Sequence, residues 1–377
     1  MSSTKRPPSD HAEAQHRRVR LADVAKRAGV SQTAASFVLT GRREEMRISL
    51  EVEARVLEAA RETGYRPNII SRSLRTGTTH TIGFISDTVA TTRFAGDLIR
   101  GALEAARDLG HLLLIAETEG DSQLEQQLLE TMADRQVDGI VLASMYTRKL
   151  TVPTLLRSGR TVLLNAVPAR PAPLISVIPD ELGAGRTAAR TLLEAGYSKG
   201  IYLIGAGPRP TQRPKPMAAL AALERLQGIK ETLATSGVRL GGAVVCQDWE
   251  PEVGYAAVEG LIARRAGVQA LICFNDRLSV GACNALHDAG LAVPDDVSVV
   301  SFDDDPIASW VQPQLTTIAL PHYELGRHSI ELLLNPRERG SSGSRQPEVD
   351  GGTIVRIPMP LRKRASVRAF APHSSTR

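Results

Sequence analysis

The feature that most constrains the fold is an alternation of short apolar runs with helical stretches, which fills residues 80–366. The apolar runs are TIGFIS, HLLLIA, DGIVLAS, TVLLNA, GIYLIG, AVVCQ, ALICFN and VSVVSFD, and helical periodicity between them marks Ala95–Asp108, Ser122–Arg135, Gly183–Glu194 and Leu278–Ala289. Apolar strands that alternate with helices are typical of parallel sheets with helices on both faces. Because so many units exceed one ordinary sheet, we predict an α/β domain with two lobes, each a doubly wound parallel sheet.

Residues 18–66 have a different, all-helical pattern. Leu21, Val24, Ala25 and Ala28 share one helical face, and Gly29 ends that helix. Ser31 suits the N-cap of a second helix from Gln32 to Leu39, and Ser49 caps a third helix that Gly64 closes. Three short helices with a glycine turn between the first two are the helix-turn-helix pattern.

The charge distribution separates these two regions. Residues 17–77 hold 13 Lys and Arg against 7 Asp and Glu, whereas residues 78–361 hold 26 against 32. A basic head on an acidic body favours a polyanionic partner for the head alone. A solvated helical surface is the alternative explanation of the charge.

The second helix carries the residues best suited to reading DNA. Gln32, Thr33 and Ser36 lie on its polar face and Ser31 at its start, where short polar side chains can reach base edges and phosphates in the major groove. The flanking basic residues suit phosphate neutralisation; they are Arg17, Arg18, Arg20, Arg42, Arg43 and Arg47. A small helical bundle with ordinary caps is the competing interpretation.

Other classes of protein find little support in the sequence. The polar N-terminus does not match a secretory signal, no run of 18 apolar residues suggests a membrane span, and three scattered cysteines suggest a reducing compartment, so we expect a cytoplasmic protein. The motifs GxSxG, HExxH and the Walker loop do not occur, and GAGPRP lacks the third glycine of a dinucleotide fingerprint. We therefore predict no catalytic residue, no metal site and no cofactor.

Several collinear stretches resemble the LacI/GalR family of bacterial transcriptional regulators. VRLADVAKRAGVSQTAASFVLTGR is similar to the family's helix-turn-helix, RISLEVEARVLEAARETGYRPN to its third helix, and SRSLRTGTTHTIGFI to its hinge and first core strand. NDRLSVGACNALHDAGLAVPDDVSVVSFDD and PQLTTIALPHYELGRHSIELLL are similar to two C-terminal stretches. The resemblance covers roughly residues 19–366 and implies a helix-turn-helix headpiece with a hinge helix, followed by a two-lobed, periplasmic-binding-protein-like effector domain.

For DNA binding, the resemblance implies a homodimer whose hinge helices become ordered on double-stranded operator DNA. Leu74 would enter the minor groove as an apolar wedge, with Asn68, Ser71 and Arg75 beside the DNA backbone. Packing of Leu74 on the core of the free protein is the alternative. The family's DNA-facing positions further imply Arg20, Leu21 and Tyr65. Phe37 stands where Arg is frequent, Ala34-Ala35 replaces Thr-Val, and Ser71 replaces a common Ala, so the operator sequence is expected to differ.

For the effector, the resemblance implies a small molecule bound between the lobes. The matching residues are Asp87, Phe94, Asn165, Arg225, Trp249, Asn275, Asp276 and Asp303. Carboxylates, an amide and a guanidinium can bind hydroxyl groups, and a Trp face can stack on a sugar or a base, which favours a sugar and leaves a purine possible. The ordinary alternatives are a turn at Asp303, an N-cap at Asn275-Asp276 and core packing of Trp249.

The expected organisation follows from these patterns. We predict a disordered arm (1–17), a DNA-binding domain (18–66), a hinge and linker (67–79), an effector and dimerisation domain (80–366) and a flexible tail (367–377). Lobe 1 is expected at about 80–178 and 309–340, and lobe 2 at about 179–308 and 341–366. The tail has no heptad repeat, which favours a dimer. A proline-rich segment at 205–220 departs from the family, with Ala219 and Ala221 near positions where relatives place polar groups. Competing functions are a solute-binding protein of transport and a sugar- or nucleotide-processing enzyme.

Overall fold

The computed structural model describes residues 19–65, 77–88, 95–157, 160–206, 219–335, 344–347 and 352–368. The chain divides into two compact units, and the boundary in the sequence falls between Thr79 and His80. The predicted arm, the hinge residues Asn68, Ser71, Leu74 and Arg75, and the predicted effector residue Phe94 lie outside the described residues.

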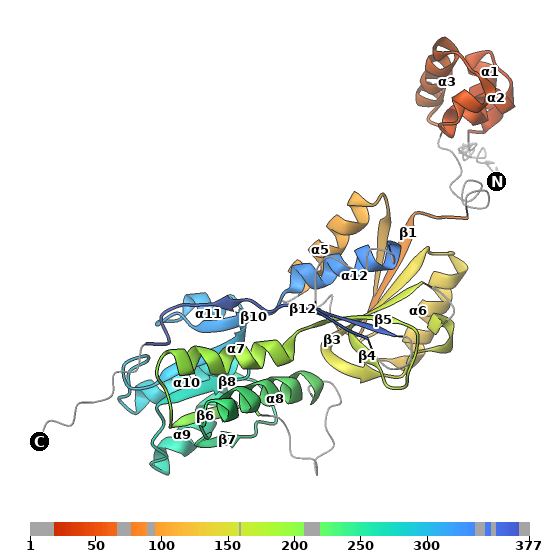
Figure 1. The fold of residues 1–377 in the computed structure, drawn as a ribbon. Helices are drawn as coiled ribbons and strands as arrows, with labels where there is room; N and C mark the ends of the chain where they lie inside the picture. Colours follow the sequence, from red (N-terminus) through yellow and green to blue (C-terminus); the bar gives the residue numbers. More distant parts are fainter. Residues whose placement is uncertain are drawn as a thin grey trace, which may run out of the picture. The chain divides into compact units, whose positions relative to one another are not determined.

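The N-terminal unit contains the helix-turn-helix. Its elements are α1 (Leu21–Ala28), α2 (Gln32–Leu39), the 3-10 turn η1 (Arg43–Met46) and α3 (Leu50–Thr63). Figure 1 labels the three α-helices. The hydroxyl of Ser31 accepts a hydrogen bond from the backbone N–H of Ala34 at 3.1 Å, and that of Ser49 accepts one from Val52 at 3.3 Å. Gly29 and Gly64 end α1 and α3 in the left-handed region, with φ of 68° and 67°. The predicted caps and stops are confirmed.

A small apolar core holds these helices together. Val24, Ala35 and Val56, one from each helix, are completely buried. Leu21 and Tyr65 pack against this core while staying partly exposed. The core is contributed by the helix faces that the apolar periodicity indicates, so the opposite face of α2 is free to carry polar residues.

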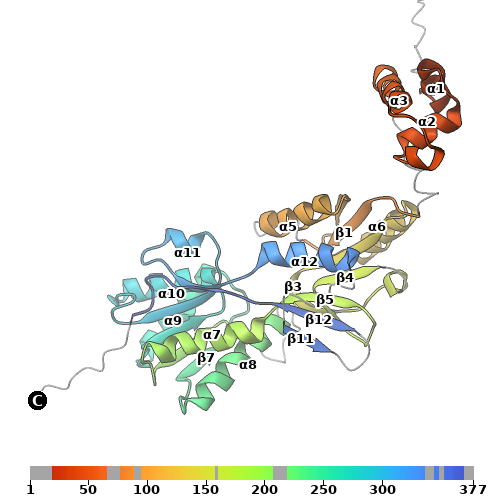
Figure 2. The same ribbon diagram turned by 45° about the horizontal axis from the view of Figure 1, so that its top comes forward.

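The C-terminal unit begins with a seven-stranded sheet. Its strands are β1 (Thr81–Ser86), β2 (Leu112–Glu117), β3 (Gly139–Leu150), β4 (Thr161–Pro168), β5 (Ile175–Pro179), β11 (Ser344–Pro347) and β12 (Thr353–Ile357). They lie in the order β11-β12-β5-β4-β3-β1-β2, and all pairs are parallel except β11 with β12. Helices α5 (Ala95–Asp108) and α12 (His322–Leu334) lie side by side against the sheet in Figures 1 and 2, while α6 (Ser122–Asp134) packs near β1.

A six-stranded sheet forms the second lobe. It comprises β6 (Ile201–Ile204), β7 (Gly242–Val244), β8 (Ala270–Cys273), β9 (Ser298–Asp303), β10 (Thr316–Ala319) and β13 (Leu361–Arg362), in the order β13-β10-β9-β8-β6-β7. Only β13 is antiparallel to its neighbour. Its helices are α7 (Glu181–Glu194), α8 (Ala219–Thr235), α9 (Pro251–Ala263), α10 (Asp276–Asp288) and the short α11 (Ile307–Trp310).

Both sheets have the same winding, which places the candidate site. The first sheet contains the order β2-β1-β3-β4-β5 and the second the order β7-β6-β8-β9-β10. In each sheet, the second strand of the chain lies on one side of the first strand, and the following strands are added one after another on the other side. Ligands of doubly wound sheets bind beyond the carboxyl ends of the strands at such reversals. The prediction of two doubly wound α/β lobes is confirmed.

The lobe boundaries differ from those expected. The sequence expectation puts residues 309–340 in lobe 1 and 341–366 in lobe 2, but β10 belongs to the six-stranded sheet and β12 to the seven-stranded sheet. The chain crosses between the sheets three times, after β5, after β10 and after β12. Strand β12 pairs with β5 over five positions, which no local pattern in either segment specifies.

Close helix packing sets the geometry of the second lobe near the candidate site. A Cβ atom on Gly185 of α7 would lie 2.2 Å from the backbone oxygen of Arg225, and one on Gly228 of α8 would lie 2.2 Å from that of Leu182. The two glycines therefore let α7 and α8 approach backbone to backbone, which brings Glu181 opposite Arg225. Within the described residues, no helix is long and apolar enough to cross a membrane.

Candidate DNA-binding surface and effector site

The start of α2 presents the predicted DNA-reading residues to solvent. Ser31, Gln32 and Thr33 are exposed, whereas Ser36 is half-buried one turn later. Arg20 is exposed just before α1, and its backbone N–H donates to the carboxylate of Asp23 at 2.9 Å. Polar groups at the N-terminus of a recognition helix are placed to meet bases or phosphates, so the surface suits the predicted contact.

The predicted phosphate-binding arginines are not equivalent. The Arg42 guanidinium lies 5.1 Å from the centre of the Phe37 ring and pairs with Glu45 at 2.5 Å, while Arg43 pairs with Glu53 at 3.1 Å. Arg47 is exposed and ends η1 in the left-handed region, with φ of 49°. The ion pairs with Glu45 and Glu53 restrain the side chains of Arg42 and Arg43. They also reduce the positive charge that these two arginines offer to a phosphate.

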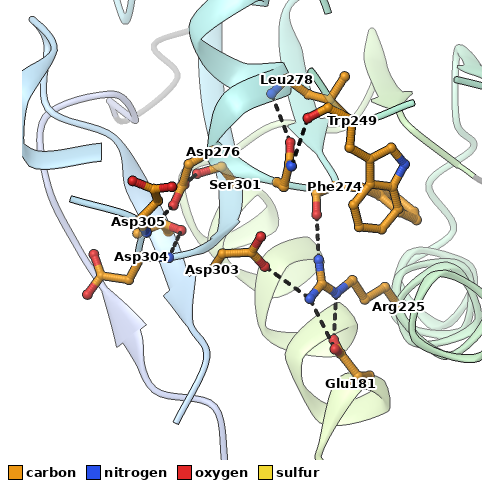
Figure 3. A network of polar contacts seen from close by, with 12 residues as sticks. Glu181, Arg225, Trp249, Phe274, Asp276, Leu278, Ser301, Asp303, Asp304 and Asp305 are labelled. Carbon is orange, nitrogen blue, oxygen red and sulfur yellow. Dashed lines mark hydrogen bonds and ion pairs between the residues drawn. The ribbon is translucent and has the colours of Figure 1, made fainter. Parts of the chain in front are cut away.

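Arg225 is the centre of a buried polar network in the second lobe (Figure 3). It is 2% exposed; its Nε donates to Glu181 at 2.5 Å, and its Nη2 donates to Glu181 at 3.0 Å and to Asp303 at 3.2 Å. Its Nη1 donates to the backbone oxygen of Phe274. Burial lowers the pKa of Arg225, but the charges of Glu181 and Asp303 outweigh burial, and the net direction is upward.

Aromatic rings enclose this guanidinium. Its carbon lies 4.5 Å from the centre of the Phe302 ring and 5.8 Å from that of Trp249. The Trp249 ring meets Phe274 edge to face at 6.0 Å and is only partly buried, although it touches the core of the lobe. A half-exposed indole beside a polar network can stack on a sugar ring or a base.

Asn275 has both ends of its amide occupied. Its Oδ1 accepts from the backbone N–H of Leu278 at 2.8 Å as the N-cap of α10, and its Nδ2 donates to the Trp249 carbonyl at 3.0 Å. The N-cap role expected as its ordinary alternative is therefore present. In this structure Asn275 holds Trp249 against the end of β8.

Asp276 points into the protein. It is 1% exposed and accepts hydrogen bonds from the Ser301 hydroxyl and from the Asp305 N–H, the latter at 2.8 Å. Burial, followed by the charge of Asp303, raises the pKa of Asp276 to about 7. These contacts tie α10 to the end of β9 and leave the Asp276 carboxylate engaged within the lobe.

Asp303 ends β9 in a strained conformation. Its φ is 104° and that of Asp304 is 58°, both in the region that favours glycine. Asp304 is clamped from the C-terminal segment by Arg364 at 2.6 Å and by Arg362 at 3.4 Å. The strained pair thus turns the Asp303 side chain toward Arg225 while Asp304 is held on the opposite side. The alternative interpretation of Asp303 is a turn residue; in the structure it also binds Arg225 through its side chain.

In the first lobe the predicted residues lie on the seven-stranded sheet, one directly after β1 and one within β4. Asp87 follows β1; its Oδ1 accepts from the Met145 N–H at 2.9 Å and its Oδ2 pairs with Arg148 at 3.1 Å, across the irregularity in β3. Asn165, in β4, is 6% exposed with φ of 53°, and its Oδ1 has no hydrogen-bond partner among the described residues. A buried amide oxygen of this kind is suited to a ligand hydroxyl.

Sequence reasoning missed two residues of this region. Glu181, on α7, binds Arg225 through both carboxylate oxygens, and Tyr146, on β3, is an exposed phenol of the first lobe. Partial burial is the first cause of the raised pKa of Tyr146; the charge of Asp303 adds to the rise and that of Arg277 opposes it. In the sequence, Glu181 looks like any acidic residue in the first turn of a helix. Its place just beyond the carboxyl end of β5 is the one signal that could have marked it as a site residue. The described residues hold no group of three or more His, Cys, Asp or Glu suited to a metal ion.

The observed architecture defines a class: a helix-turn-helix unit joined to a two-lobed α/β unit with a polar and aromatic cluster at its strand ends. Two family profiles match the chain in that order. The profile described as bacterial regulatory proteins, lacI family, matches residues 20–68, and the one described as periplasmic binding proteins and sugar binding domain of LacI family matches residues 79–364.

Known relatives agree with these profiles. The chain is 32% identical to the HTH-type transcriptional regulator AscG of Escherichia coli (strain K12), over 89% of this chain and 96% of that protein. It is 31% identical to the ribose operon repressor of the same strain, over 84% and 92%. Among solved structures, a lac repressor dimer bound to operator and the anti-inducer ONPF covers 93% of this chain and 99% of its own, with a TM-score of 0.72 and 23% identity. A structure of the transcriptional regulator CelR in complex with cellobiose covers 93% of this chain and 100% of its own, with a TM-score of 0.60 and 25% sequence identity.

The chain belongs to the LacI family of bacterial regulatory proteins. It is a ligand-controlled, DNA-binding transcriptional regulator, and its relatives are regulators rather than enzymes. The family assignment made from the sequence is confirmed.

Proposed function

We propose that this regulator is a repressor whose affinity for an operator is controlled by a sugar bound between the two lobes. The observation that carries the proposal is the cluster of Arg225, Trp249 and Asp303 beyond the strand ends of the second lobe. In the first lobe, Asp87 follows the end of β1, and Asn165 lies within β4 where the pairing with β3 is interrupted. Carboxylate and amide oxygens beside a half-exposed indole suit a ring that carries several hydroxyl groups.

The DNA half of the proposal rests on the exposed start of α2. Gln32 and Thr33 would read base edges, with Ser31, Ser36 and Arg20 positioning the helix on the backbone. We further propose that residues 67–79 form the hinge, that Leu74 is the minor-groove wedge beside Asn68, Ser71 and Arg75, and that Tyr65 and Leu21 support the DNA-facing surface. Two copies of the chain, forming a dimer in the cytoplasm, would then each bind one half-site of the operator.

Control of DNA binding requires a ligand that distinguishes two states of the effector domain. Because the chain crosses between the sheets three times, a change in the angle between the lobes would move all three connections together. A sugar that bridges the lobes would favour one angle, and the coupling to operator affinity is expected to be about 1–3 kcal/mol.

Fluorescence anisotropy on the chain's own upstream DNA tests this proposal. A labelled duplex from the upstream region and a scrambled duplex are titrated at two salt concentrations, with and without a panel of neutral sugars, and with purine bases as the alternative class. We expect operator-specific binding that at least one sugar changes several-fold. Equal binding to both duplexes would contradict the operator assignment. A response to purines alone would show that the effector is a purine and not a sugar.

A further inference from the structure

Glu181 places a second carboxylate beside the guanidinium that the candidate effector site is built on. It is the first residue of α7, directly after the crossover from β5, and it is 2% exposed. Both of its carboxylate oxygens contact Arg225, at 2.5 and 3.0 Å. Burial raises the pKa of Glu181, and the ion pair with Arg225 opposes that rise.

Arg225 has little capacity left to bind an anion. An arginine has five N–H donors, and four of those of Arg225 are committed, two to Glu181, one to Asp303 and one to the Phe274 carbonyl. The rings of Phe302 and Trp249 lie within 4.5 and 5.8 Å of its guanidinium carbon. An incoming phosphate or carboxylate would have to displace a carboxylate that is already bound through two hydrogen bonds.

Carboxyl groups outnumber guanidinium groups in the network. One guanidinium faces the carboxylates of Glu181 and Asp303, and Asp276 and Asp305 lie next along the end of β9 (Figure 3). The network therefore offers hydrogen-bond acceptors to a ligand and disfavours a ligand that carries a negative charge.

We propose that Glu181 is a specificity-determining residue that restricts the effector to uncharged or amino-bearing polyhydroxyl compounds and excludes their phosphate and carboxylate derivatives. This inference rests on the proposed function, because it concerns the ligand of the same site. Arg225 then acts as the organiser of two carboxylate acceptors, while the ligand supplies hydroxyl or ammonium donors. Rejection is expected to be roughly tenfold or more in Kd, because the unfavourable group adds its repulsion to the loss of its hydration.

The experiment is isothermal titration of the full chain with matched series of sugars. The glucose series contains glucose, glucosamine and glucose 6-phosphate, and the ribose series contains ribose and ribose 5-phosphate. We expect at least one neutral or amino sugar to bind and its phosphate ester to bind at least tenfold more weakly. A phosphate ester that binds within twofold of its parent, or more tightly, would overturn the proposal without touching the assignment of a sugar-controlled repressor.

Two variants separate charge from size. Glu181→Gln keeps the shape and one acceptor but removes the charge, so the gap between sugar and phosphate ester should narrow several-fold. Glu231→Gln is the matched control, because Glu231 pairs with Arg186 across the same α7–α8 contact at 2.9 Å but is exposed, and it should leave the gap unchanged. An unchanged gap in Glu181→Gln overturns the proposal. If Glu181→Gln does not fold, the wild-type series still decides. If no sugar of any kind binds, the proposed function fails and this inference fails with it.

Discussion

Glu224 and Arg356 form a two-point ion pair, 2.8 Å at each contact, that joins α8 of the second lobe to β12 of the first lobe's sheet. The next residue along α8, Arg225, binds Glu181 at the start of α7, directly after β5. Two adjacent residues of one helix therefore hold two of the three connections between the lobes. One of these residues also belongs to the candidate effector site, so ligand binding and lobe geometry meet at this point of α8.

The first prediction concerns that pair. Both side chains are 14% exposed, so Arg356→Ala should lower the free energy of unfolding by about 1–3 kcal/mol, between the values for surface and buried pairs. It should also shift the effector concentration for half-maximal response. Urea denaturation and a dose–response titration measure the two effects. The control is Arg327→Ala in the more exposed Arg327–Glu331 pair, which should leave the response midpoint unchanged. An unchanged midpoint in Arg356→Ala would refute the coupling role.

The second prediction separates stability from recognition at Arg225. Arg225→Met leaves the buried carboxylates of Glu181 and Asp303 without their cation and should cost about 3–5 kcal/mol. The double variant Arg225→Met with Glu181→Met should recover much of that loss, because it removes both members of the buried pair. Neither variant should respond to effector, while folded protein should still bind the operator. A normal response in the double variant would remove Arg225 from the site.

The third prediction uses two N-caps of the same kind. Ser31→Ala and Ser49→Ala each remove a side-chain acceptor from a helix N-terminus and should each cost about 1 kcal/mol of stability. Only Ser31 lies at the start of the proposed recognition helix, so only its loss should weaken operator binding beyond the effect on folding. Anisotropy at a temperature where both variants are folded makes the comparison. Equal losses of affinity would argue against a DNA contact by Ser31.

The fourth prediction follows from the proposed hinge. Leu74→Ala should weaken binding to the operator far more than binding to random DNA, because an apolar wedge stabilises only the bent, specific complex. Parallel titrations of the two duplexes test it at one salt concentration, since affinity for DNA depends strongly on salt. Equal losses on both duplexes would contradict the wedge role.

The fifth prediction is a dependence of stability on pH. Burial, and then the charge of Asp303, raises the pKa of Asp276 from 3.8 to about 7 in the folded protein. Between these values the folded state binds more protons than the unfolded state, so the contribution of Asp276 to stability falls as the pH rises from about 4 to 7, by at most roughly 4 kcal/mol. Asp276→Asn should flatten that part of the curve measured by urea denaturation. A variant with the wild-type slope would show that another group is responsible.

Local sequence accounts for much of the head and for part of the larger domain. The caps Ser31 and Ser49, the stops Gly29 and Gly64, and the bounds of α2 and α5 follow from residues within one or two helical turns. Eight apolar runs correspond to β1–β4 and β6–β9. Strands β5, β10 and β12 were not predicted, because ISVIP, TTIA and TIVRI are short or interrupted by polar residues and proline, and their pairing partners stabilise them.

The candidate site divides in the same way. Sequence patterns and the family resemblance were enough to predict the family, the two doubly wound sheets and a common site for Arg225, Trp249 and Asp303. Two contacts become visible only in the folded chain: Glu181, 44 positions before Arg225, occupies two of the donors of Arg225, and Asp276 faces Ser301 inside the lobe. Propensities and caps act over a few residues, whereas such partners are set by which strands become neighbours and how closely two helices can pack.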